Sequence, residues 1–281
     1  MQLDMLLVRA AERLARAGSP SPRLDAEVLL CHVLGVERTW LYTWGDRMAP
    51  TFQRARFEAL VAARVAGHPV AYLTGEREFW GLVLATSPHT LIPRPDTETL
   101  VEVLLGLADE TSGRLLDLGT GTGAIALAFA SERPGWQALG IDRVSEAVAL
   151  AESNARRLGI ANVRFLVSDW FSAVAQQRFA LIAANPPYID ADDPHLAQGD
   201  VRFEPRSALV ALESGLADLR HIAECAVGHL VPGGWLALEH GHDQAAAVRE
   251  LLEARGYGDV ASRRDLGGQE RVTFGRRPDQ R

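Results

Sequence analysis

The run Arg114-Leu-Leu-Asp-Leu-Gly119-Thr120-Gly121-Thr122-Gly123-Ala124, which continues as Ile-Ala-Leu-Ala-Phe-Ala130, decides the fold of this chain. The apolar residues before Gly119 predict a buried strand, and the alanine-rich residues after Gly123 predict a helix. The glycines between them let the backbone turn sharply and approach a ligand closely. We therefore expect a strand, a turn and a helix, with ligand contacts from the turn residues Gly119, Thr120, Gly121, Thr122 and Gly123.

A single carboxylate follows the glycine turn at an informative distance. Asp142 ends a second apolar run, 138–141, and lies roughly 20 residues beyond the turn. An acid at this spacing suits hydrogen bonding to ribose hydroxyls. Asp142 is therefore predicted to bind the ribose of a nucleoside, while capping of the next helix is a role compatible with the same position.

The segment Asn185-Pro186-Pro187-Tyr188 follows another apolar run, 179–184, at the predicted carboxyl end of a strand, where open α/β sheets bind ligands. The Asn185 amide can hold a planar amino group, and the prolines present carbonyls in set directions without competing N–H donors. Tyr188 adds a flat face. We predict Asn185, Pro186 and Tyr188 as catalytic residues and the whole segment as substrate-binding. The alternative is a structural β-turn.

The identity of the nucleoside is open from the glycines alone. Gly119, Gly121 and Ala124 also satisfy the relaxed dinucleotide pattern G-x-G-x-x-A. Asp117, the extra Gly123 and the later Asn-Pro-Pro-Tyr turn favour S-adenosylmethionine over a nicotinamide dinucleotide. A glycine turn that only packs a helix on a strand is the remaining alternative.

Strand and helix patterns alternate through most of the chain, which is typical of a doubly wound, mostly parallel α/β sheet. Residues 1–66 show helical spacing and predict a small helical domain, and 67–95 contain a predicted β-hairpin linker. Residues 96–281 form the predicted sheet domain. Its expected strands are 114–118, 138–142, 163–167, 179–184 and 234–239, followed by an antiparallel C-terminal hairpin of 259–264 and 270–274.

Composition excludes several classes of protein. With 47% hydrophobic and 23% charged residues the chain is ordinary for a globular protein, and its net charge of −7 argues against broad binding to nucleic acid.

Cys31 and Cys225 are isolated, which fits a reducing cytosol. No run approaches the roughly 20 apolar residues that span a bilayer, so we expect a cytoplasmic protein without membrane contact. His195 and His240 lack partners at ligand spacing, and no metal site is expected.

Six runs occur together in one order along the chain: 74–80, 91–98, 119–124, 168–171, 185–190 and 199–205. Through these runs the chain resembles the bacterial release-factor glutamine methyltransferases over nearly its whole length. The resemblance implies that 96–281 is a methyltransferase domain with S-adenosylmethionine as cofactor. It also implies methylation of the side-chain amide nitrogen of the glutamine in the Gly-Gly-Gln motif of class I peptide release factors, which are the expected partners. The helical domain is expected to dock this substrate.

The resemblance also implies roles for residues outside the two turns. It places the segment with Asp169 and Trp170 beside the adenine of the cofactor. Either Trp170 stacks on the ring or Asp169 accepts a hydrogen bond from its amino group, and the sequence leaves open which of the two makes the contact. Arg94 and Thr97 either close over the methionine end of the cofactor or serve only as a helix entry. The long polar stretch 189–205 is typical of a lid or a binding segment.

Three other functions compete with this interpretation. The first is an adenine or guanine amino-methyltransferase acting on nucleic acid, because such enzymes use similar turns; the acidic balance weighs against it. The second is a non-catalytic, cofactor-binding partner of the translation machinery, which has no need of Asn185. The third is a nicotinamide oxidoreductase, which the motif context disfavours.

Overall fold

The computed structural model describes residues 1–278 and divides into two compact units. The helical unit consists of Met1–Glu76 together with Pro194–Phe203. The sheet unit consists of Arg77–Asp193 together with Glu204–Arg281. No helix within residues 1–278 is both long enough and apolar enough to cross a membrane.

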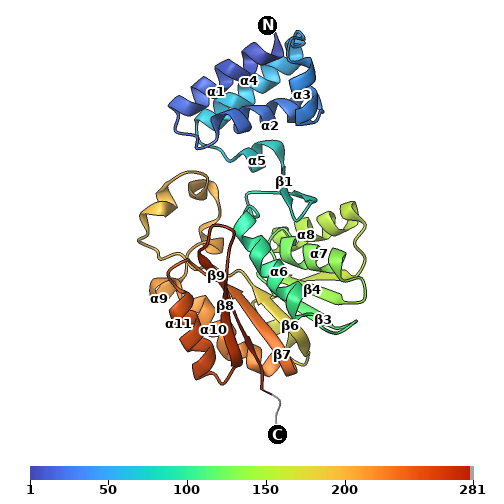
Figure 1. Ribbon diagram of the computed structural model, residues 1–281, viewed down its shortest axis with the longest axis vertical. Helices are drawn as coiled ribbons and strands as arrows, with labels where there is room; N and C mark the ends of the chain where they lie inside the picture. The colour runs from blue at the N-terminus through green and yellow to red at the C-terminus, as the bar shows by residue number, and fades with distance from the viewer. Residues whose placement is uncertain (279–281) are drawn as a thin grey trace. The chain divides into compact units, whose positions relative to one another are not determined.

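The helical unit packs amphipathic helices around leucines and one phenylalanine, with Leu14, Leu29 and Phe57 almost fully buried. Ser21 precedes the second helix, and Pro22 lies in its first turn. Its hydroxyl donates to Asp25 Oδ1 (3.0 Å) instead of accepting from a backbone N–H. The helices, in chain order in Figure 1, are α1 (Leu3–Arg16), α2 (Pro22–Leu34), α3 (Arg38–Trp44), α4 (Thr51–Val65) and α5 (Val70–Thr74).

A segment from far along the chain completes the helical unit. Arg64, whose side chain is 9% exposed, donates to Asp25 Oδ2 (2.8 Å) and to Asp200 Oδ1 (2.5 Å). His68 and Phe203 pack with ring centroids 4.7 Å apart. The unit therefore runs past the expected boundary at 66 as far as Glu76 and takes in 194–203, part of the stretch that the sequence indicated as a lid or binding segment.

The sheet unit begins with a hairpin and a short helical entry. Strands β1 (Glu76–Phe79) and β2 (Leu82–Ala85) pair within the predicted linker. The turn between them contains Trp80, whose backbone N–H donates to Glu98 Oε1 (2.9 Å). The 3₁₀ turn η1 (Pro95–Thr97) then leads into α6 (Glu98–Leu107).

A seven-stranded sheet forms the centre of this unit, in the order β5-β4-β3-β6-β7-β9-β8. All pairs from β5 to β7 are parallel, whereas β9 is antiparallel to both β7 and β8. This confirms the predicted fold class, including the antiparallel C-terminal hairpin. The strands are β3 (Arg114–Leu118), β4 (Gln137–Asp142), β5 (Val163–Val167), β6 (Phe179–Ala184), β7 (Leu230–Glu239), β8 (Gly258–Arg264) and β9 (Glu270–Arg276).

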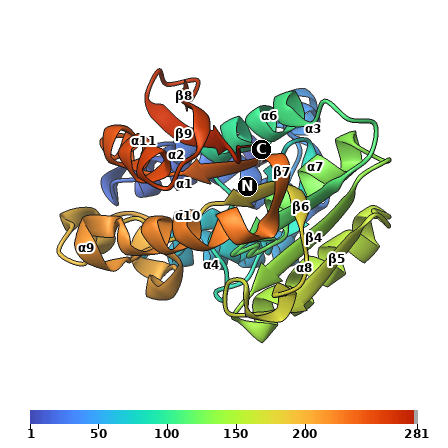
Figure 2. The ribbon, with the colours of Figure 1, turned by 90° about the horizontal axis from the view of Figure 1, so that it is seen from below.

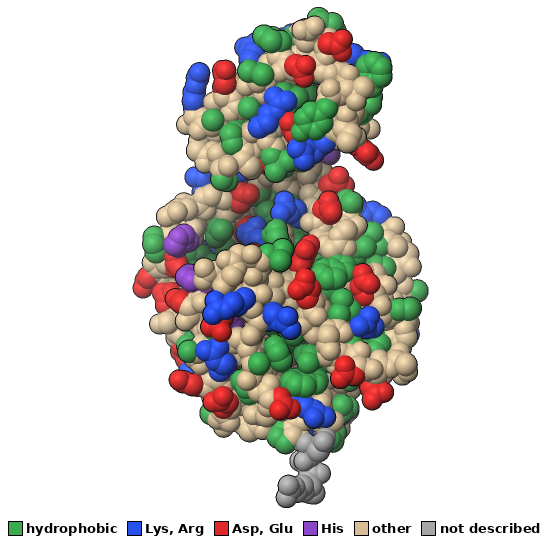
Figure 3. Space-filling view, in the orientation of Figure 1, with side chains coloured by type: hydrophobic (Ala, Val, Ile, Leu, Met, Phe, Trp, Pro, Cys, Tyr) green, Lys and Arg blue, Asp and Glu red, His purple; other side chains and the backbone are tan. Residues whose placement is uncertain are grey.

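Helices cover both faces of the sheet and bury two apolar clusters. The first cluster joins the sheet to α6, α7 (Ala124–Glu132) and α8 (Ser145–Leu158). The second joins it to α10 (Ala217–His229) and α11 (Ala245–Ala254). Figure 2 shows α6 and α7 on one side of the sheet and α10 and α11 on the other. Basic and acidic side chains are interspersed on the face in Figure 3.

The returning segment provides a test of this architecture. Replacing Asp200 by Asn removes the ionic part of its bond to Arg64, which we expect to weaken the attachment by about 1 kcal/mol, because Asp200 is partly exposed. Amide hydrogen exchange of 194–203, measured by mass spectrometry, should become roughly fivefold faster. The exposed Asp46→Asn in the same unit is the matched control. Equal exchange in the two variants would contradict this role of Arg64.

Candidate active site

A cavity of about 1140 Å³, its open mouth included, lies at the carboxyl ends of the parallel strands. It opens next to β3, where the strand order reverses between β4 and β6. Ligands of doubly wound sheets bind at such a point. The residues singled out in the sequence that line it are Arg94, Thr97, Gly119, Thr120, Gly121, Thr122, Ala124, Asp142, Asp169, Trp170, Asn185, Pro186 and Pro187.

The glycine turn after β3 leaves room for a ligand on one side only. Gly119, Gly121 and Gly123 all have positive φ angles, which side chains disfavour. A Cβ built on Gly119 or Gly121 would meet nothing closer than 4.0 Å, so these two expose open backbone to the cavity. A Cβ on Gly123 would lie 3.0 Å from Leu127 Cδ1, and Gly123 does not line the cavity. Its role in the structure is close packing of α7 on the sheet.

Asp142 holds two backbone segments at once. Its Oδ2 accepts from Gly121 N (3.0 Å), which fixes the glycine turn, and its Oδ1 accepts from Val144 N (2.9 Å) at the start of α8. The Asp142 carboxylate thus lines the cavity and contacts the residue before α8, and its binding of a ribose stays a prediction. Each oxygen keeps a further lone pair, so the carboxylate can still accept from two hydroxyls of a ligand.

Asp117 lies beneath the glycine turn and is fully buried. Its Oδ2 accepts from Thr120 Oγ1 (2.6 Å) and from Ala126 N (3.3 Å), while Oδ1 has no hydrogen-bond partner within the described chain. Burial raises the pKa of this carboxyl to about 7, against the lowering effect of the two hydrogen bonds. Asp117 supports the turn from behind.

The segment after β5 supplies an aromatic wall. Trp170 has a positive φ of 43°, an uncommon conformation that is held by the Ser168 hydroxyl, which donates to Trp170 O (2.8 Å). Asp218, at the start of α10, also lines the cavity, and sequence reasoning missed it. Burial raises the pKa of the Asp218 carboxyl, and the charge of Asp169 raises it further, whereas Arg143 lowers it.

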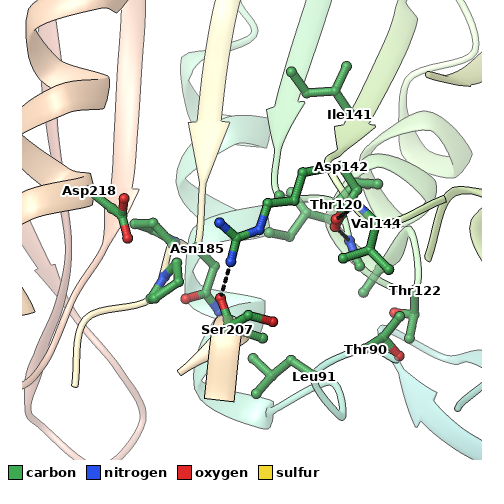
Figure 4. A pocket seen from close by; sticks show the side chains of 18 of the residues that line it. Thr90, Leu91, Thr120, Thr122, Ile141, Asp142, Val144, Asn185, Ser207 and Asp218 are labelled. Atoms are coloured by element: carbon green, nitrogen blue, oxygen red, sulfur yellow. Dashed lines mark hydrogen bonds between the residues drawn. The ribbon is translucent and has the colours of Figure 1, made fainter. Parts of the chain in front are cut away.

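The cavity is covered on one side by the chain that returns after residue 203. Arg143 Nη2 donates to Ser207 O (3.3 Å), and Ser207 lies near Asn185 in Figure 4. The buried Glu204 accepts from Ile92 N (2.9 Å) through Oε2 and pairs with Arg94 through Oε1. Arg94 lines the cavity, so its ion pair fixes a wall of the site.

Asn185 borders the cavity across from the glycine turn (Figure 4). Its Nδ2 donates to Thr97 Oγ1 (3.2 Å). Because the amide nitrogen is used in this bond, Oδ1 is available as an acceptor. Pro186 is buried and, like Pro187, lines the same cavity, whereas Tyr188 does not.

The Tyr188 side chain turns from the cavity toward Glu239, the last residue of β7. Its hydroxyl donates to Glu239 Oε1 (3.4 Å), and burial followed by the negative charge of Glu239 raises the pKa of the phenol. Burial also raises the pKa of Glu239 to about 7, although hydrogen bonds from Thr97 and Tyr188 lower it. Sequence reasoning missed Glu239; its only signal was a carboxylate at the predicted end of a strand.

The backbone of the Asn-Pro-Pro-Tyr turn is clamped from the other side. Gln244 Nε2 donates to both Tyr188 O (3.0 Å) and Ser214 O (3.2 Å). A Cβ built on Gly215, whose φ is +83°, would lie 2.0 Å from Tyr188 O. Glu213 and Ser214 also have positive φ angles, so three consecutive residues adopt the left-handed conformation against this turn. Neither Gln244 nor Gly215 carried a recognisable sequence signal.

Comparison with known proteins assigns the chain to a family. Residues 5–75 match the model of the PrmC N-terminal domain, and 95–201 match that of the methyltransferase small domain. A release factor glutamine methyltransferase of Vibrio cholerae serotype O1 is 55% identical over 97% of this chain and 96% of its own length. One of Pseudomonas aeruginosa is 57% identical over 92% of this chain and 93% of its own. The chain belongs to the release factor glutamine methyltransferase family.

Solved structures agree on the fold. A methyltransferase from Pyrococcus furiosus matches with a TM-score of 0.55 and 19% identity, covering 79% of this chain and 98% of that one. At this identity the likeness concerns the fold alone. The resemblance drawn from the sequence motifs is confirmed by the family matches, and the chain is a methyltransferase.

Gly215 gives a test of the clamped turn. Alanine at this position adds about 1–2 kcal/mol of left-handed strain and forces Tyr188 O to move. A displacement on the order of 1 Å at a catalytic turn costs on the order of 10²-fold in rate. We expect Gly215→Ala to lower the kcat of methyl transfer by this factor, measured beside the melting temperature. Gly228→Ala, in open space on α10, is the control and should leave kcat unchanged. Equal kcat in both variants would contradict the clamp.

Proposed function

We propose that this protein transfers the methyl group of S-adenosylmethionine to the side-chain amide nitrogen of the glutamine in the Gly-Gly-Gln motif of class I peptide release factors. The observation that carries this proposal is that Asn185 and Pro186 border the same cavity as the glycine turn and Asp142. The family to which the chain belongs supports the choice of protein substrate. The two free cysteines, Cys31 and Cys225, favour the cytoplasmic location expected from the sequence.

The residues around the glycine turn fit a nucleoside with a charged tail. The open backbone at Gly119 and Gly121 accommodates close approach, and Asp142 retains acceptor capacity for ribose hydroxyls. Trp170 and Asp169, which line the cavity, offer an aromatic face and an acceptor for an adenine. We assign Gly119 to Thr122, Asp142, Asp169, Trp170 and Asn185 to the cofactor site. Gly123 supports it by packing.

The chemistry requires an amide nitrogen to act as a nucleophile, although its lone pair is delocalised into the carbonyl. The bound cofactor supplies a methyl group on a positively charged sulfur. Asn185 Oδ1 and the Pro186 carbonyl each accept one N–H of the substrate amide, which holds the nitrogen in place and stabilises the positive charge that develops on it. As the N–C bond forms and the S–C bond breaks, the surplus proton on nitrogen leaves to water. Positioning thus replaces a strong base.

Tyr188 is predicted from the sequence to be catalytic and to contact the substrate with its aromatic ring, but its side chain does not line the cavity. We propose that its phenol anchors the turn through Glu239, and that Pro186 and Pro187 contact the substrate. We further propose that the helical unit docks the release factor. The model of the PrmC N-terminal domain covers residues 5–75 and so coincides closely with this unit.

Methylation of an exocyclic amino group in nucleic acid is the competing activity, because the same turn can bind such a group. The net charge of −7 and the interspersed charges in Figure 3 give little support to a nucleic-acid surface. A labelled-donor assay distinguishes the two. We expect label in a class I release factor, none in a release factor whose motif glutamine is replaced, and none in RNA.

Asn185→Ala tests the mechanism. Loss of one fixed acceptor at the developing charge should lower kcat by about 10²–10³-fold, while the Kd of the cofactor changes far less. Single-turnover kinetics and calorimetry measure the two quantities. A kcat within twofold of that of the unaltered protein would refute the proposed role of Asn185.

Asp142→Ala tests the cofactor site. Removal of a charged acceptor for two hydroxyls, and of the bond that fixes Gly121, should weaken S-adenosylmethionine binding by roughly 10–100-fold. Asp109→Ala, at an exposed position away from the cavity, serves as the control. The Kd of each variant is measured by calorimetry, and an unchanged Kd in Asp142→Ala would remove this residue from the site.

A further inference from the structure

Two buried side chains from distant parts of the sheet unit, Thr97 and Glu239, lie behind Asn185. Asn185 Nδ2 donates to Thr97 Oγ1 (3.2 Å), and Thr97 is among the hydrogen-bonding groups that lower the pKa of the Glu239 carboxyl. Glu239 follows Leu238, which pairs in the sheet with Ala184, the residue before Asn185. Thr97 and Glu239 are 4% and 1% exposed. The series therefore runs from Asn185, which follows β6 and borders the cavity, through the buried Thr97 of η1 to the buried Glu239 at the end of β7.

The chemistry of these groups gives the series a direction. An ionised carboxylate only accepts hydrogen bonds, so the single proton of the Thr97 hydroxyl points toward Glu239. The lone pairs of Thr97 Oγ1 then face Asn185, which must present its –NH₂ to them. Because Nδ2 faces Thr97, the other polar atom of the Asn185 carboxamide, Oδ1, points away from Thr97.

We propose that Glu239 is a positioning residue for methyl transfer, which acts through Thr97 to hold the Asn185 carboxamide with its oxygen toward the substrate amide. This inference rests on the proposed function. It concerns the orientation of a planar amide whose two ends are nearly equal in shape, so packing alone cannot select between them. An Asn185 flipped by half a turn would present donors to the donors of the substrate.

The protonation state of Glu239 controls this orientation. A protonated carboxyl can donate to Thr97, whose hydroxyl is then free to donate to Asn185 Oδ1 and to stabilise the flipped amide. Burial raises the pKa of Glu239 to about 7. The ionised, active arrangement is therefore present above that pH and is lost as the pH falls through it.

The charged groups around Glu239 come from every neighbouring element. Arg271 on β9 lowers the pKa of Glu239, and Asp96 on η1 raises it. Arg271 is itself shared with Asp265 (3.1 Å) and Asp96 (3.5 Å), so it neutralises Glu239 only in part. Burial also lowers the pKa of the adjacent His240, which favours its neutral form.

The first test is the pH dependence of kcat with a class I release factor, measured between about pH 5.5 and about pH 9. The unaltered protein should lose activity toward low pH with an apparent pKa of about 7. Glu239→Gln presents an amide that can donate as well as accept, so kcat should fall about tenfold at high pH and the acidic limb should disappear. An unchanged limb in Glu239→Gln would overturn the proposal.

The second test changes Thr97, the residue between Asn185 and Glu239, and can be carried out even if Glu239→Gln does not fold. Thr97→Val keeps the shape but removes the hydroxyl, and kcat should fall about tenfold, with a smaller change in cofactor Kd. Thr97→Ser should restore most of the activity. Thr99→Val, a buried substitution on α6, is the matched control. Equal kcat for Thr97→Val and Thr99→Val would refute the role of Thr97.

Tyr188→Phe separates the two bonds to Glu239. It removes a hydrogen bond that lowers the pKa of Glu239, so the acidic limb should shift to higher pH without disappearing. A limb that stays in place would show that it belongs to another group. If the unaltered protein does not methylate release factor at any pH, the proposed function fails; if it does and the variants behave like it, only this inference fails.

Discussion

When the chain segments that follow two adjacent parallel strands pass to opposite faces of a sheet, they leave the carboxyl ends of these strands uncovered between them. After β3 the chain enters α7 on one face, and after β6 it eventually enters α10 on the other. A crevice therefore opens between the two strand ends. The glycine turn leaves β3 on one side of this crevice, and the Asn-Pro-Pro-Tyr turn leaves β6 on the other. A methyl donor and an acceptor can meet there because the topology leaves space for both.

Behind the two turns that border this crevice, the protein buries carboxyl groups against their preference for water. Asp117 behind the glycine turn and Glu239 behind the second turn both have pKa values raised by burial to about 7, and each keeps one oxygen without a hydrogen-bond partner in the described part of the chain. Such groups are costly to bury. Their positions, directly behind the two turns that line the cavity, indicate that the cost serves orientation of the site.

Much of the sheet could be predicted from the sequence because its central strands are buried on both faces and appear as short apolar runs. The bounds of β3 and β6 match the expected ones. The start of β7 lies at Leu230, before the predicted 234, because Pro232-Gly233-Gly234 interrupts the apolar run without ending the strand. The glycine turn and the Asn-Pro-Pro-Tyr turn could also be located from the sequence, because each comes directly after the apolar run of a strand.

What the sequence could not give depends on contacts between distant residues. The bond from Arg64 to Asp200 adds 194–203 to the helical unit, and no local periodicity records it. The prolines fix the backbone of the second turn but leave the direction of the Tyr188 phenol to Glu239, which lies 51 residues later. No sequence pattern marks Gly215, and its importance is visible only in the structure, where a Cβ at this position would collide with Tyr188 O.

The segment 194–203 is connected in sequence to residues next to the cavity of the sheet unit. The segment 194–203 belongs to the helical unit, and the residues on either side of it lead directly into the site. On one side, residues 189–193 connect it to Tyr188 of the Asn-Pro-Pro-Tyr turn. On the other side, Glu204 binds Ile92 N and Arg94 at the cavity wall. The segment is therefore tied by its own chain to the sheet unit at two points, and at Glu204 a backbone hydrogen bond and an ion pair fix the chain to the cavity wall within one residue of the segment.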